Sequence, residues 1–82
     1  MQYTLHCRVV DQTGRPIPEV AVAIVEAPQA MPDLAQLTNT EGELDWGALP
    51  SGSYTLQLQH GGHSRRVTTS LPLADTLVVT LP

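Results

Sequence analysis

Two of the three histidines, His60 and His63, are the first candidates for chemistry in this sequence. They flank Gly61-Gly62, and a Gly-Gly pair suits a two-residue hairpin turn that would place the two imidazoles opposite each other. Two imidazoles can hold an adventitious metal ion, but a dedicated zinc site uses three or four protein ligands. No carboxylate lies close to them in the sequence. We therefore expect a polar hairpin tip, with no metal and no cofactor.

A second candidate is the run His63-Ser64-Arg65-Arg66, which combines a base, a hydroxyl and two cations. Side chains of these types could take part in acyl transfer or bind an anion. Neighbouring residues of a strand point to opposite faces, however, so His63 and Ser64 do not meet readily. Arginines at this place commonly protect an edge strand against aggregation. Exposed Arg is also enriched at interfaces, so we take Arg65 and Arg66 as candidate partner-binding residues and expect no catalytic residue.

The remaining reactive types also favour structural roles. The carboxylates lack the ligand spacing of a calcium loop, and we interpret them as solvated turn residues (Asp11, Glu41, Glu43 and Asp45). Cys7 is the only cysteine, so no intramolecular disulfide can form. It lies in an alternating segment, where a small buried hydrophobe is expected.

Charge and length narrow the classes of function. The chain has 82 residues, a net charge of -4, four Arg and no Lys. This is too little positive charge for nucleic-acid binding or for an anionic membrane surface. We expect a single domain over residues 1–82. No apolar run approaches the roughly 20 residues of a membrane span, and no signal peptide is evident. We therefore expect cytoplasmic synthesis, with any export by a signal-independent route.

The residues considered above must be positioned by strands, and strands are predicted where apolar and polar residues alternate. In 3–10, Tyr3, Leu5, Cys7 and Val9 share one face, which predicts a half-buried strand. The aliphatic run 20–26 predicts a second strand whose core face carries Val20, Val22 and Ile24 and whose other face carries Ala21 and Ala23. The small alanines leave room for something to pack closely. The segment 27–33 is predicted to be a loop because its prolines disfavour both helix and central strand; it holds Pro28, Met31 and Pro32.

The segment 38–56 has a high density of turn-forming residues. A polar turn at 38–42 precedes Leu44 and Trp46, which are two residues apart. After them come a corner at Leu49-Pro50, a turn at Ser51-Gly52 and a strand that starts near Tyr54. A short strand at 34–38, a more polar return strand at 64–70 and a last, alternating strand at 76–81 are also predicted. About seven strands at roughly ten-residue spacing predict an all-β, seven-stranded antiparallel Greek-key β-sandwich.

Two spaced signatures resemble the carboxypeptidase regulatory-like domains. The first begins at Val9-Val10-Asp11 and continues through Gly14, Pro16-Ile17-Pro18 and Val20; the second has Thr38-Asn39, Glu41-Gly42, Leu49-Pro50, Gly52, Tyr54 and Leu56. The resemblance implies a transthyretin-like (prealbumin-like) sandwich, with the Tyr54 hydroxyl capping a nearby backbone group. Two departures are Glu19, where the family usually has Gly, and an Asn39-x-Glu41-Gly42 turn in place of Asp-x-Asp-Gly.

The resemblance implies a non-enzymatic accessory, spacer or binding module. We expect a protein partner, bound by a loop or an edge strand, in an assembly such as a secretion or phage-tail-like machine. The candidate partner-binding residues are Ala21, Ala23, Pro28, Met31, Pro32, Arg65 and Arg66. One alternative is an enzyme of the hydroxyisourate-hydrolase type that uses His6. Such enzymes complete their site with a Tyr-Arg-Gly-Ser motif, which does not occur among the 82 residues. Another is a carbohydrate- or surface-binding module, for which Tyr3 is the only aromatic available for stacking.

Overall fold

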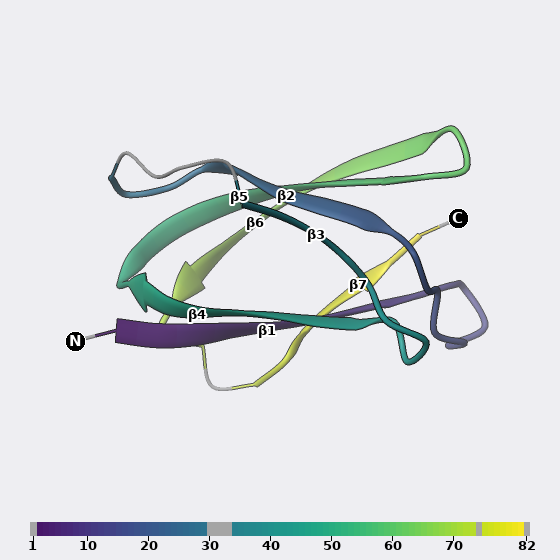
Figure 1. Cartoon of the computed structure of the whole chain (residues 1–82), viewed down its shortest axis with the longest axis horizontal. Coiled ribbons are helices and arrows are strands. Elements are labelled where there is room, and N and C mark those ends of the chain that lie inside the picture. Colours follow the sequence, from purple (N-terminus) through teal and green to yellow (C-terminus); the bar gives the residue numbers. More distant parts are fainter. Residues whose placement is uncertain (1, 30–33, 74, 82) are drawn as a thin grey trace.

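The computed structural model describes residues 2–29, 34–73 and 75–81, and they form two sheets packed face to face (Figure 1). The strands are β1 (Gln2–Val10), β2 (Ala21–Glu26), β3 (Leu34–Leu37), β4 (Glu43–Pro50), β5 (Gly52–His60), β6 (His63–Leu71) and β7 (Leu77–Thr80). The three-stranded sheet has the order β4-β1-β7, and the four-stranded sheet has the order β3-β2-β5-β6. The predicted seven-stranded β-sandwich is confirmed.

Strand pairing is antiparallel except in one place. β1 pairs with β4, β2 with β3 and β5, and β5 with β6, all antiparallel. β7, however, pairs with β1 in parallel, with Val9 opposite Val79. The sequence pattern predicted antiparallel strands throughout. The difference arises because β1 and β7 are at opposite ends of the chain, and alternation along each strand carries no information about their relative direction.

The core lies between the sheets and is mostly aliphatic. Its buried members come from both sheets and include the predicted core-facing residues of β1 and the start of β2 (Leu5, Cys7, Val9, Val20, Val22, Leu44, Trp46, Leu49, Tyr54, Leu56, Leu58, Leu71, Val79 and Leu81). Tyr3 and Ile24 are only partly buried but pack against this cluster. Side-chain alternation thus assigned the inner faces correctly, because successive residues of a strand point to opposite sides.

The predicted corner at Leu49-Pro50 is corrected in one detail, since both residues still belong to β4. A β-bulge shifts the register between Tyr3 and Leu5, and Ala48 in the facing segment has a φ of 58°. The extra residue changes the parity of β4, so that Leu49 is buried like Leu44 and Trp46 although it lies three positions after Trp46. The chain then crosses from one sheet to the other at Ser51.

Side-chain capping holds the turns that the sequence indicated. The Tyr54 hydroxyl donates a hydrogen bond to the Pro50 carbonyl, which confirms the predicted tyrosine cap. The Asn39 side-chain oxygen accepts hydrogen bonds from the backbone N–H groups of Glu41 and Glu43, at 2.9 and 3.0 Å. Asn39 therefore organises this turn, and Gly42 supplies its positive φ of 72°.

Candidate functional site

The outer face of the four-stranded sheet carries a patch of small and apolar side chains. We call it the small-residue face and define it by Ala21, Ala23 and Val25 of β2 and Ala35 and Leu37 of β3. The antiparallel register places Ala21 opposite Leu37 and Ala23 opposite Ala35. Leu37 is 63% exposed and Val25 is 41% exposed. An aliphatic side chain left this open is costly in water, so such clusters commonly mark interaction surfaces.

The alanines make this face concave. A groove of about 350 Å³ runs across it, lined by Ala21, Val22, Ala23, Val25, Ala35, Gln57 and Gln59. The methyl groups of the alanines form the floor, and the longer Gln57 and Gln59 side chains of β5 stand beside them, because they lie directly opposite Ala23 and Ala21. The groove can therefore make apolar contacts with a side chain of matching shape, and the two amides at its rim can form hydrogen bonds.

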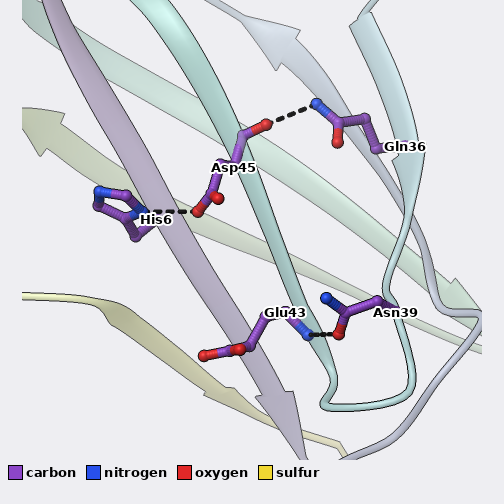
Figure 2. Close-up of polar contacts among 5 residues, drawn as sticks. All are labelled: His6, Gln36, Asn39, Glu43 and Asp45. Atoms are coloured by element: carbon purple, nitrogen blue, oxygen red, sulfur yellow. Dashed lines mark hydrogen bonds and ion pairs between the residues drawn. The ribbon is translucent and has the colours of Figure 1, made fainter.

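The outer face of the three-stranded sheet has a different character. His6 of β1 lies opposite Asp45 of β4, and its Nδ1 is 2.6 Å from an Asp45 carboxylate oxygen (Figure 2). Arg8 lies opposite Glu43 two pairs further along, which is the next pair on the same face. Charged and polar residues thus cover the β1–β4 part of this face, whereas Val78 of β7, opposite Arg8, is 58% exposed. The contrast in polarity is therefore between the β1–β4 part of one sheet and the β2–β3 part of the other.

The His6–Asp45 pair lies on an open part of the surface. Both side chains are largely exposed, with 57% and 63% of their surfaces in contact with solvent. General-base catalysis requires a nucleophile or substrate group held within hydrogen-bond distance of the imidazole. Among the described residues, the only polar contact of the His6 ring is with Asp45. The geometry therefore fits a surface cross-strand pair.

Two polar bridges connect the sheets along their open sides. The Gln36 side chain of β3 donates a hydrogen bond of 2.7 Å to the Asp45 carbonyl of β4 (Figure 2). On the other side, the Arg65 guanidinium of β6 donates one of 2.6 Å to the Thr80 carbonyl of β7. Arg65 therefore contributes to closing the sandwich, a role that the sequence reasoning did not assign to it.

The predicted hairpin at His60–His63 is confirmed, and it projects from the end of the molecule away from the N-terminus (Figure 1). His60 and His63 are direct cross-strand partners, and Gly61 and Gly62 both have positive φ. The tip borders a hollow of about 580 Å³ that also reaches Glu19 and Ala21. No cluster of three or more potential metal ligands is found in residues 2–29, 34–73 and 75–81.

Cys7 is a core residue. Its side chain is 1% exposed, and burial raises the pKa of the thiol from 9.0 to about 11. Because the thiolate is the reactive form, the thiol of the folded protein is unreactive at neutral pH.

The structure brings together only some of the predicted partner-binding residues. Ala21 and Ala23 share the small-residue face. Pro28 lies at another place and packs closely over Gly52, where an added Cβ would come within 2.7 Å of it. Arg65 and Arg66 are neighbours on β6 and point to opposite sides of the sheet: Arg65 bonds Thr80, and Arg66 reaches Gln57 at 3.3 Å. Met31 and Pro32 lie outside the described residues.

Sequence reasoning missed Val25, Ala35 and Leu37. The first continues the alternation of Ala21 and Ala23, and this signal was present in the sequence. The other two belong to a four-residue strand, too short to show a pattern. Only the pairing of β3 with β2 reveals that they extend the same surface.

Comparison with known families gives a match that covers nearly the whole chain. Residues 4–82 match the model of the carboxypeptidase regulatory-like domain. None of the curated proteins matches the chain. No helix that is long and apolar enough to cross a membrane occurs in the described part of the chain.

Proposed function

Because the chain belongs to the carboxypeptidase regulatory-like domain family, we propose that it is a protein-interaction module and not an enzyme, and that a partner protein docks on the small-residue face. The domain of this family is a non-catalytic β-sandwich module. The observation that carries the proposal is the exposed, concave apolar surface made by β2 and β3, with Leu37 63% exposed beside the alanine floor.

The chemistry of this surface defines the partner that fits. The lining residues of the groove carry no charge, and the Arg66 guanidinium bonds the Gln57 oxygen at its rim. A charged side chain buried over the alanines would therefore lose hydration without meeting a charged lining residue. Large aliphatic or aromatic side chains can fill the groove over the alanine methyl groups and cover Leu37 and Val25. We therefore assign a partner whose contact surface is uncharged at its centre and presents such side chains, with donors or acceptors for the Gln57 and Gln59 amides.

The proposal extends to the biological setting. We place the chain as an accessory of a larger assembly, such as a secretion or phage-tail-like machine, in keeping with the accessory role expected of the family. Co-purification of tagged chain with structural components of such an assembly from the native host supports this setting. A partner that belongs to no larger assembly counts against it.

The docking proposal is tested with matched charge insertions on the two outer faces. Ala21→Glu places a carboxylate on the small-residue face, whereas Thr4→Glu places one at an exposed position of β1 on the opposite face. Proteins retained by the wild-type chain in host lysate are identified, and each is then purified for a direct measurement of Kd with both variants. Thermal unfolding of each variant confirms that it folds.

The expected result is a partner whose Kd rises at least about tenfold with Ala21→Glu, because binding would bury the new carboxylate without a counter-charge. Thr4→Glu is expected to leave the Kd unchanged. The proposal fails if every reproducible partner binds Ala21→Glu as tightly as the wild type, or if no partner is found at all.

A further inference from the structure

A second surface, the free edge of β6, has properties that the small-residue face does not share. β6 is one of the two outer strands of the four-stranded sheet, and within residues 2–29, 34–73 and 75–81 it pairs only with β5. It is nine residues long, and it pairs in continuous register from Gly52–Leu71 to His60–His63. Of the other three edge strands, β3 and β7 have four residues each and β4 contains the bulge. β6 is therefore the longest regular edge of the sandwich.

The backbone of β6 has groups available for pairing. The two-residue turn makes His60 and His63 a hydrogen-bonded pair, and antiparallel strands alternate hydrogen-bonded with non-hydrogen-bonded pairs. It follows from the register that Ser64, Arg66, Thr68 and Ser70 direct their N–H and C=O groups away from β5. Such a row of unpaired groups is a template for an added strand. β6 contains no proline and no bulge to prevent this.

The charge of this region is opposite to that of the chain as a whole. The protein has a net charge of -4, yet the segment 52–71, which spans β5 and β6, contains no Asp or Glu. It holds two of the four Arg and two of the three His. Arg65 lies toward the β7 side and Arg66 on the outer side, so a strand added at this edge would meet a cation on each of its faces.

We propose that the free edge of β6 accepts an extended acidic strand from a partner protein. Main-chain hydrogen bonds would supply affinity, as in other cases of β-strand addition. The two arginines would select against basic strands, because like charges placed together across an interface are unfavourable. This surface is distinct from the small-residue face, and the inference does not depend on docking there.

The first test measures binding of two labelled peptides of the same length as β6. One has the sequence Thr-Val-Thr-Glu-Glu-Thr-Val-Thr-Val, and the other has Lys in place of both Glu. Fluorescence anisotropy is expected to show saturable binding of the acidic peptide that weakens as salt is raised. The basic peptide is expected to bind at least about fivefold more weakly. The NMR signals of the Ser64, Arg66, Thr68 and Ser70 amides are expected to gain protection from hydrogen exchange when the acidic peptide is bound.

Three variants locate the site. Arg66→Glu is expected to weaken binding of the acidic peptide about fivefold to tenfold and to improve binding of the basic one. Arg15→Glu makes the same charge change on an exposed loop residue and is expected to change neither affinity. Thr68→Pro removes an outward N–H from β6 and is expected to abolish binding; Arg66→Glu keeps the test valid if the proline variant does not fold.

Several results would overturn the proposal. One is the absence of saturable binding of the acidic peptide at about 1 mM, a concentration at which weak complexes are still populated. Another is equal affinity for the two peptides, or protection that lies outside β6. A homodimer that is lost in Thr68→Pro would also overturn it, because a second copy of the chain would then occupy the edge.

Discussion

Removing one hydroxyl group at Tyr54 tests the account of how the chain passes between the two sheets. β4 ends at Pro50 in one sheet and β5 begins at Gly52 in the other, with only Ser51 between them. The Tyr54 ring is fully buried, and its hydroxyl bonds the Pro50 carbonyl across this crossing. Tyr54→Phe keeps the ring in the core and removes only that bond.

The expected loss of stability follows from the setting of the bond. A neutral hydrogen bond contributes about 0.5–1.5 kcal/mol net, and a buried acceptor left without a partner costs about 1–3 kcal/mol. Pro50 is only half-buried, so water can partly replace the lost donor, and we expect about 1.5 kcal/mol. For a domain of this size that corresponds to a fall in Tm of about 6–12 °C.

The assay is urea unfolding followed by Trp46 fluorescence, together with thermal unfolding. Tyr3→Phe is the matched control, because it removes the same atom from a partly buried tyrosine of β1. No hydrogen bond of the Tyr3 hydroxyl occurs within the described ranges, so a change within about 0.5 kcal/mol is expected. Equal effects of the two substitutions would refute the role assigned to the Tyr54–Pro50 bond.

Three further predictions concern backbone strain and burial. Gly42→Ala is expected to destabilise by about 2–4 kcal/mol, because φ is 72° and an added Cβ would come within 2.5 Å of the Val9 carbonyl oxygen. Gly14→Ala, at φ 87° with nothing within 4 Å, should cost only about 1 kcal/mol; urea unfolding compares the two, and equal losses would contradict the steric argument. Glu19→Gly is expected to stabilise by about 0.5–1 kcal/mol, since Glu19 has a φ of 60° that glycine adopts without strain; an unchanged or lower midpoint in urea would contradict this. Cys7 should resist alkylation until the protein unfolds. Because burial raises the pKa of the Cys7 thiol from 9.0 to about 11, the stability that this thiol contributes is fully present below pH 9.0, and about 2–3 kcal/mol of it is lost as pH rises toward 11. Cys7→Val should reduce this loss and leave the part above pH 10 that comes from Tyr54, whose pKa burial also raises.

The departure at Glu19 illustrates how sequence and structure complement each other. The sequence showed that Glu stands where the family usually has Gly, but this alone did not give the reason for the preference. The structure supplies it, because the backbone at Glu19 is in the left-handed region. By contrast, the Asn39 turn could be interpreted from the sequence, since the Asn side chain commonly bonds backbone N–H groups two or more residues further on.

The small-residue face was only half predictable. Alternation placed Ala21 and Ala23 on the side away from the core, because each strand residue has only two directions available. It could not show that Ala35 and Leu37 continue the surface, since a short strand has no measurable period. Arg65 and Arg66 were predicted as a pair, yet Arg65 bridges to β7 while Arg66 stays on the outer face.

The sequence alone determined the features that depend on neighbouring residues. These are the class of fold, the inner faces of β1, β2 and β5, and the Gly61-Gly62 hairpin, whereas the capping role of Tyr54 was implied by the family resemblance. Each of the first three is set by local backbone preferences or by the two-residue period of a strand. Tertiary structure decided which strands lie side by side, including the parallel pairing of β1 with β7 and the exposure of the β6 edge. These pairings depend on how the two sheets bury a common core, which is formed by contacts between residues far apart in the chain.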